Sequence, residues 1–179
     1  MGMKRIPLLF FLLLSFSVVS QEWIQDNSKT AVSFTIRNFG VNVEGQFNDV
    51  SISTNFNTDD LPQFQLKATI KVGSMDTGIT GRDEHIMKKN YFDAKTHPVM
   101  TLESKSIRRV KDDNYLLKAT LTIKGKEQQM EIPIQLREED NELQLSSQFV
   151  VNRKDFGVGG GSLIMSKNVK VSVTYIGNR

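Results

Sequence analysis

The residues that could perform acid–base chemistry gather in one irregular stretch, residues 73–104. Asp83 and His85 are separated by one residue, and Asp76 and Asp93 lie on either side of them. General acid–base catalysis needs such groups within hydrogen-bond reach of one another and of a substrate. Residues two apart on a helix point to different sides, and aspartate is common in turns and at helix starts. We therefore favour structural roles for these carboxylates.

Other kinds of catalytic or metal site lack the residues that they need. His85 and His97 are the two histidines of the chain, and no ligand set surrounds either at metal-binding spacing. No cysteine is present, which excludes thiol catalysis, disulfides and a lipid anchor on cysteine. No Gly-x-Ser-x-Gly elbow is present. The glycine-rich segment 156–162 lacks the features of a phosphate loop, and we expect a mobile loop there that could gate a cavity. We predict no metal site and no cofactor.

Three cations, Arg82, Arg153 and Lys154, could contribute to a binding site. An arginine at a cavity mouth can hold a phosphate or carboxylate in bidentate fashion. The alternative is structural, in which Arg82 or Arg153 pairs with Asp83 or Asp155 and joins the irregular stretch to the end of a strand. The sequence leaves both interpretations open.

Outside the irregular stretch, apolar and polar residues alternate with the period of β-strands. The apolar phase changes between Phe47 and Val50, which predicts a bulge or kink near 48–49. Pro133 inside an alternating run indicates an edge position or a bulge. Eight strands are predicted, at Ala31–Asn38, Val41–Phe56, Phe64–Val72, Val99–Val110, Tyr115–Ile123, Gln128–Arg137, Glu142–Val151 and Val169–Ile176.

The irregular stretch itself predicts one short helix, which begins at Thr80 or Gly81 and ends at Lys89. Acidic residues in its first turn and lysines in its last suit the helix dipole. Ile86 and Met87 would form its buried side. The fold class is therefore all-β, an eight-stranded antiparallel barrel with one short helix in the crossover near residues 80–90. Two sheets packed face to face are the alternative.

Composition and charge bound the domain and its partners. Lys4 and Arg5 followed by the apolar run 6–19 indicate a secretory signal, residues 1–20, cleaved near Ser20–Gln21. The run is short for a membrane span, which needs about 18 apolar residues, although an uncleaved anchor is the alternative. Without the signal the chain keeps 21 basic and 20 acidic residues, a net charge of +1. These charges are interspersed, so nucleic acid is not an expected partner.

Several motifs in the mature chain resemble those of one family, the YceI-like proteins, which are described as polyisoprenoid-binding, lipocalin-like and secreted. One difference is Ile86, which stands where the family often has leucine. The matching motifs are Trp23-x-x-Asp26 with Ser28 and Val32-Ser33-Phe34, Val43-x-Gly45-x-Phe47, Ser74-Met75-Asp76-Thr77-Gly78, Arg82-Asp83-x-His85, Tyr91-Phe92-Asp93, His97-Pro98, Leu121-Thr122-Ile123-Lys124-Gly125 and Arg153-Lys154-Asp155-Phe156-Gly157.

The resemblance implies a lipid-binding barrel domain over residues 21–179 that is exported to the periplasm or secreted and is not an enzyme. It implies a long apolar cavity that holds a polyprenyl or quinone tail, no stable membrane anchor after signal cleavage, and a homodimer as one oligomeric state to test. The apolar stripes serve equally as core, so a filled barrel that acts as an interaction module stays open, as does a barrel hydrolase or isomerase that uses Asp83 and His85. The expected ligand-binding residues are Phe34, Ile36, Phe47, Phe64, Leu66, Ile70, Arg82, His85, Leu121, Phe149 and Arg153.

Overall fold

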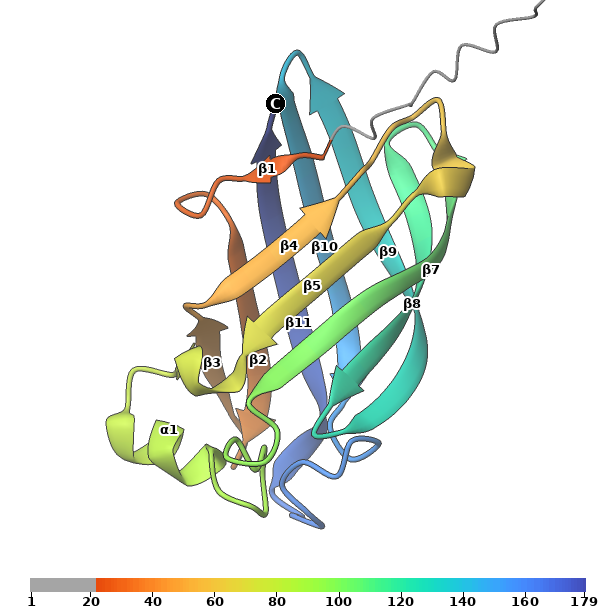
Figure 1. The fold of residues 1–179 in the computed structure, drawn as a ribbon. Helices are drawn as coiled ribbons and strands as arrows, with labels where there is room; N and C mark the ends of the chain where they lie inside the picture. Colours follow the sequence, from red (N-terminus) through yellow and green to blue (C-terminus); the bar gives the residue numbers. More distant parts are fainter. Residues whose placement is uncertain (1–21) are drawn as a thin grey trace, which may run out of the picture.

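A computed structural model describes residues 22–179, and the predicted signal, residues 1–20, lies outside this range. Within it the chain forms eleven strands, one α-helix and two short 3-10 helices (Figure 1). The helices are α1 (Thr80–Ile86), η1 (Leu61–Gln63) and η2 (Val72–Ser74). The strands are β1 (Ile24–Gln25), β2 (Ala31–Asn38), β3 (Val41–Phe47), β4 (Val50–Thr54), β5 (Leu66–Lys71), β6 (Met75–Asp76), β7 (Val99–Lys111), β8 (Asn114–Ile123), β9 (Lys126–Glu139), β10 (Glu142–Asn152) and β11 (Met165–Asn178).

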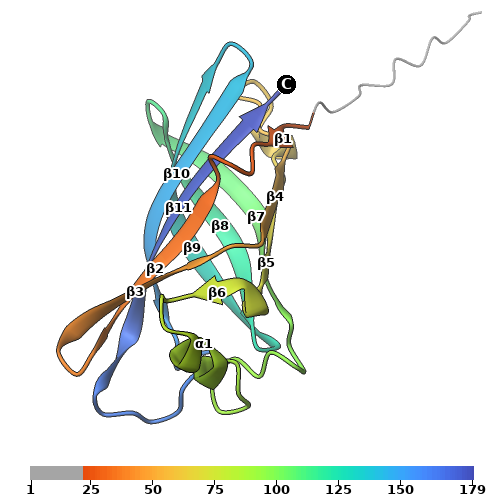
Figure 2. The same cartoon turned by 90° about the vertical axis from the view of Figure 1, so that its left-hand side faces the viewer.

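All the strands belong to one antiparallel sheet that curls round an interior (Figure 2). Its order is β4-β5-β7-β8-β9-β10-β11-β2-β3-β6, and β1 pairs with β11. The end strands of this order are β4 and β6, and the chain passes directly from β3, the neighbour of β6, into β4. The predicted all-β fold with one short helix in a crossover is confirmed.

The junction between β3 and β4 lies at residues 48–49, where the sequence predicts a kink. Before the junction Phe47 pairs with Met75 of β6, and after it Val50 pairs with Ile70 of β5. The Asn48 N–H donates to the Ser74 carbonyl at 3.0 Å, which keeps the bent segment attached across the break. The alternation of apolar and polar residues changes phase at this junction. The side of the backbone that faces the interior therefore changes there as well.

The strand count differs slightly from the eight predicted. In residues 22–179, the predicted strand 41–56 is divided into β3 and β4, and two strands of two residues each, β1 and β6, are added. Such short strands carry no alternation that a sequence pattern can detect. The remaining strands correspond to predicted ones, and β2 has the predicted bounds.

The side chain of Gln25 completes the wall between β1 and β4. Its Nε2 donates to the Val50 carbonyl at 2.8 Å, and its Oε1 accepts the Ile52 N–H at 2.6 Å. An amide side chain thus replaces a backbone ladder at a place where the strands diverge. This pairing fastens β1 to β4.

The helix is shorter than predicted, because it ends at Ile86 and not at Lys89. Beyond it, the Phe92 N–H donates to the Ile86 carbonyl and the Ala94 N–H to the Met87 carbonyl. These bonds use the carbonyls that a longer helix would need and fold residues 87–97 into successive turns. No helix in the described part of the chain is long and apolar enough to cross a membrane.

Pro133 occupies a local edge of β9, as predicted. The ladder between β9 and β10 ends at the pair Ile134–Ser147, one residue before the proline reaches it. The Ser147 hydroxyl donates to the Pro133 carbonyl at 2.7 Å. From this point β9 and β10 separate, and proline is tolerated because no ladder bond needs its missing N–H.

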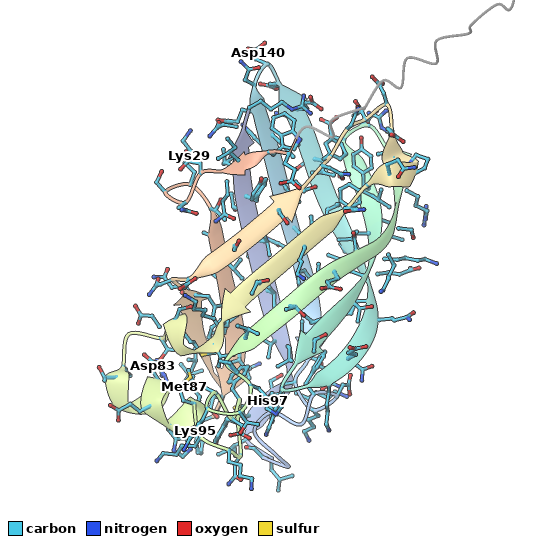
Figure 3. All side chains as sticks on the ribbon, viewed as in Figure 1. Lys29, Asp83, Met87, Lys95, His97 and Asp140 are labelled. Carbon is cyan, nitrogen blue, oxygen red and sulfur yellow. The ribbon has the colours of Figure 1, made fainter. Side chains whose placement is uncertain are left out.

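The two ends of the barrel differ. The closed end carries β1, η1 and the β7–β8 and β9–β10 turns, and the open end carries the β2–β3 turn, α1, the β8–β9 turn and the 153–164 loop. Figure 3 places Asp140 at the closed end and Asp83, Met87, Lys95 and His97 at the open end. The larger apolar core fills the closed end, with Trp23, Phe56, Phe64, Tyr115, Leu136, Leu143 and Tyr175 among its buried members.

Candidate functional site

A cavity of about 350 Å³ lies in the barrel between the large core and the open end. Its lining is almost entirely hydrocarbon and comes from both sides of the curled sheet and from α1. A cavity of this size lies within the range of sites that hold one small-molecule ligand. Ten of the eleven residues predicted for ligand binding line it: Phe34, Ile36, Phe47, Leu66, Ile70, Arg82, His85, Leu121, Phe149 and Arg153.

The exception is Phe64, which lies in the core of the closed end. Its ring is buried and meets the ring of Phe56 edge to face, with centroids 6.2 Å apart. Alternation placed Phe64 on the inward face correctly, but alternation does not tell how far along the barrel a residue lies. Phe64 therefore does not line the cavity, in contrast to the prediction.

Small side chains form part of the cavity wall on this side of the barrel. Val169, Val171 and Val173 of β11 and Ala68 of β5 all line the cavity. At the closed end the corresponding space is filled by rings such as those of Tyr115 and Tyr175. Val169, Val171 and Val173 are only half-buried although they line the interior of the barrel.

Two aromatic rings form one wall of the cavity. Phe34 of β2 and Phe47 of β3 have ring centroids 5.5 Å apart. The Phe34 ring lies across Gly45, where any Cβ would collide with it. Glycine at position 45 therefore allows the Phe34 ring to approach β3 closely.

Polar side chains gather where the cavity approaches α1. The Thr77 hydroxyl donates to the Asp83 carboxylate and accepts from Arg82 Nε at 2.7 Å. Arg82 Nη2 donates to the Thr77 carbonyl at 2.7 Å. The predicted direct pairing of Arg82 with Asp83 is therefore replaced by a link through Thr77. This link holds the guanidinium at the cavity wall.

Arg82 keeps capacity for a further acceptor. In the described residues its Nη1 has no hydrogen-bond partner, and no carboxylate lies within ion-pair distance of its guanidinium. Exposed His85 also lines the cavity, so the cavity reaches solvent beside α1, and we call this opening the portal. A cation at the portal is placed to meet the polar end of a ligand whose apolar part lies inside.

The possible acid–base pair is not assembled. The Asp83 carboxylate accepts hydrogen bonds from the backbone and side chain of Thr77, and His85 packs its ring against that of Tyr91 with centroids 5.0 Å apart. No hydrogen bond joins Asp83 to His85 in residues 22–179. No cluster of three or more histidines and carboxylates within these residues is arranged to hold a metal ion.

Arg153 is a buried organiser of the 153–164 loop. It donates to the carbonyls of Val158 at 2.7 Å, Ser166 at 2.8 Å and Met165 at 3.0 Å, with a longer contact to Gly160. Burial lowers the pKa of its guanidinium, although the nearby Tyr91 hydroxyl opposes this shift. The predicted alternative of an ion pair with Asp155 is wrong, because the carboxylate of Asp155 accepts from the Asn152 amide instead.

The loop that Arg153 organises is anchored more firmly than its glycines indicated. Phe156 and Val158 are buried and form a second, smaller core with Leu121 and Val151. Half-buried Tyr91 and Phe92 pack against it from the irregular stretch. This second core covers the space where β9 and β10 separate.

Sequence reasoning missed several residues of the cavity. Val169 and Val171 stand on the inward phase of a predicted strand and could have been found by alternation. Tyr91, Phe92 and Thr77 come from the irregular stretch, where no period indicates direction. Only the fold brings these side chains to the cavity.

Comparison with known families agrees with the resemblance found in the sequence motifs. A family model described as the YceI-like domain matches residues 23–175. A UPF0312 protein of Photorhabdus laumondii is 27% identical over 95 residues, which cover 52% of this chain and 49% of that protein. This chain thus spans about half the length of that curated relative.

Solved structures share the fold. BcnA of Burkholderia cenocepacia has a TM-score of 0.81 and 27% identity over 85% of this chain and 98% of its own. A polyisoprenoid-binding domain of Saccharophagus degradans, implicated in plant cell wall breakdown, has a TM-score of 0.69 and 15% identity over 88% of this chain and 97% of its own. At 15% identity, the match to the Saccharophagus degradans domain shows a shared fold only.

Proposed function

Because the chain belongs to the YceI-like domain family, we propose that it is a binding protein that holds a long-chain isoprenoid or related lipid in its barrel cavity. A polyprenyl chain or the tail of a quinone is the expected class of ligand. The observation that carries the proposal is the apolar cavity between the filled closed end and the portal. The similar fold of a domain named for polyisoprenoid binding supports the same ligand class.

A lipid tail buried against the apolar lining of the cavity can bind with useful affinity even if it makes few polar contacts. Each methylene removed from water contributes about 0.8 kcal/mol. Ten buried carbons would contribute roughly 8 kcal/mol before the costs of binding are subtracted. A lipid tail therefore suits the cavity better than a polar metabolite, which would leave its own polar groups unpaired there.

The polar end of the ligand would lie at the portal. Arg82 lies on the cavity wall with one guanidinium nitrogen that has no hydrogen-bond partner in the described residues, and His85 also lines the cavity there. A phosphate, carboxylate or quinone carbonyl could accept from this guanidinium. Arg153 would contribute by shaping the loop, since its guanidinium already donates to backbone carbonyls.

We further propose that the protein is exported to the periplasm or secreted, with residues 1–20 as its signal and 21–179 as its domain. Catalysis is not part of the proposal, since Asp83 and His85 are engaged with Thr77 and Tyr91 and not with each other. The alternative of a hydrolase would need these contacts to break.

Native mass spectrometry of the mature protein, prepared from the exporting cell, tests the proposal directly. We expect a stoichiometric adduct that yields a polyprenyl or quinone mass after extraction. A protein that stays ligand-free after incubation with such lipids would refute the proposal and favour the filled-barrel interaction module. The same spectra report whether the protein is a monomer or a homodimer.

A further inference from the structure

The open end exposes a group of large apolar side chains beside the portal. Phe39 is 72% exposed and Leu163 is 100% exposed, and Val41, Ile79 and Ile164 are also exposed. The Phe39 N–H donates to the Ile164 carbonyl at 3.0 Å, so the β2–β3 turn and the 153–164 loop are in direct contact. Figures 1 and 2 place both segments at the same end of the barrel as α1.

Phe39 is held in a backbone conformation that its side chain does not favour. It has φ of 50°, and Gly40 after it has φ of 79°. Two-residue hairpin turns with both residues at positive φ prefer Asn-Gly, and a bulky residue at the first position is strained. Since the ring is mostly exposed, folding gains little from it. A bulky residue kept at positive φ with an exposed side chain indicates a function other than stabilising the fold.

The open end is also the basic end of the molecule. Residues 37–41, 77–98, 124–126 and 152–168 carry ten basic and four acidic residues, a net charge of +6. The remainder of 22–179 carries eleven basic and sixteen acidic residues, a net charge of −5. The ten basic residues are Arg37, Arg82, Lys88, Lys89, Lys95, Lys124, Lys126, Arg153, Lys154 and Lys167.

None of these ten cations forms an ion pair within residues 22–179. The eight ion pairs found there use cations elsewhere on the barrel, such as Lys29, Lys67 and Arg179. Arg153 is buried and donates to backbone carbonyls, but the exposed cations of this group, such as Lys88, Lys95 and Lys154, have no ion-pair partner among these residues and are available to an anionic partner.

We propose that the open end docks on an anionic phospholipid membrane, with Phe39, Leu163 and Ile164 entering the interface and the surrounding lysines meeting the head groups. Exposed apolar side chains among cations are the combination that binds such surfaces. Docking in this orientation places the portal against the membrane. The inference goes beyond the proposed function, because membrane binding does not require a lipid in the cavity.

Sedimentation with vesicles tests the docking surface. The mature chain, from Gln21, is incubated at low salt with vesicles of pure phosphatidylcholine or of phosphatidylcholine with 30% phosphatidylglycerol, about 30% being enough to give a strongly negative surface. We expect binding to the anionic vesicles that weakens as salt is raised. No binding to the anionic vesicles would overturn the inference.

The substitution Phe39→Asn separates membrane docking from a role in folding. Asparagine relieves the strained turn, so the Tm should rise by about 2–4 °C. Loss of the ring should weaken vesicle binding about tenfold or more. Val110→Ser, which removes an exposed apolar side chain at the closed end, is the matched control and should leave vesicle binding unchanged. Unchanged binding of Phe39→Asn would overturn the inference.

Charge is tested with a second matched pair. Lys88→Gln with Lys95→Gln at the open end should weaken vesicle binding by roughly fivefold per lysine. Lys105→Gln with Lys111→Gln at the closed end removes the same charge and should have a much smaller effect. Equal losses would mean that net charge alone, and not this surface, governs binding.

Lipid content measured on the same variants separates this inference from the proposed function. Phe39, Lys88 and Lys95 do not line the cavity, so retained lipid should be unchanged in these variants. Failure to bind vesicles by a protein that retains lipid would overturn only the docking inference. Vesicle binding by a protein that never retains lipid would overturn only the proposed function.

Discussion

Replacing one alanine by phenylalanine at two positions should have opposite effects on stability. Ala68 of β5 lines the cavity, whereas Ala119 of β8 is buried in the large core and does not line it. At position 68 the ring would enter empty space, and cavity filling commonly stabilises a protein by about 0.5–2 kcal/mol. At position 119 the ring would overpack a closed core, which costs about 1–3 kcal/mol or more.

The same ring at position 68 should abolish lipid binding. Its six added carbons would occupy the volume of about as many ligand carbons. At about 0.8 kcal/mol per carbon the loss approaches 5 kcal/mol, more than three orders of magnitude in Kd. The prediction for Ala68→Phe is thus a protein that is at least as stable as the wild type and does not retain lipid.

Guanidinium denaturation and displacement of a fluorescent fatty probe measure the two quantities. If Ala68→Phe destabilises the protein as much as Ala119→Phe, the space beside Ala68 is not empty and the reasoning from the cavity is refuted. If Ala68→Phe binds lipid with unchanged Kd, the lipid lies elsewhere.

Three further predictions concern the parts that hold the barrel together. Burial raises the pKa of Tyr175 to about 12, so between pH 10 and 12 the unfolded chain loses its phenol proton first, and the free energy of unfolding should fall by roughly 2–3 kcal/mol across that window. Tyr175→Phe should lose this part of the pH dependence in urea titrations, and an unchanged slope would contradict the assignment. Arg153→Lys should cost about 2–4 kcal/mol and expose the 153–164 loop to proteolysis, because an ammonium cannot reach the carbonyls that the guanidinium fork spans. Gln25→Ala should cost about 1–2 kcal/mol, measured by thermal unfolding, since it leaves a donor and an acceptor of β4 unpaired, whereas Asn27→Ala, which removes only an exposed acceptor of the Gln25 amide, should cost less.

The strands were predictable because alternation is a local property. The bounds of β2, the break at 48–49 and the inward phase of β9 and β10 follow from neighbours one or two residues apart. The end of α1 was not predictable in this way. It depends on bonds such as that from the Phe92 N–H to the Ile86 carbonyl, which belong to the turns that follow the helix.

The roles of the two arginines show where sequence reasoning reaches its limit. Both were identified as cations near a possible cavity, and both line it. The charge of Arg153 is taken up by backbone carbonyls on either side of its loop, whereas Arg82 is held by Thr77 and has one guanidinium nitrogen without a hydrogen-bond partner among residues 22–179. No spacing in the sequence distinguishes these two environments, because the carbonyls come from residues whose positions the loop itself determines.

The sequence by itself determined the all-β fold, the inward face of each long strand and the family. Tertiary structure decided that the barrel is filled at one end and hollow at the other. The reason is that a void depends on the summed volume of side chains that meet across the interior, such as Ala68 of β5 and Val171 of β11, which lie about a hundred residues apart in the chain. Tertiary structure also brought the basic and exposed apolar residues of four separate connections to the same end of the molecule, beside the portal.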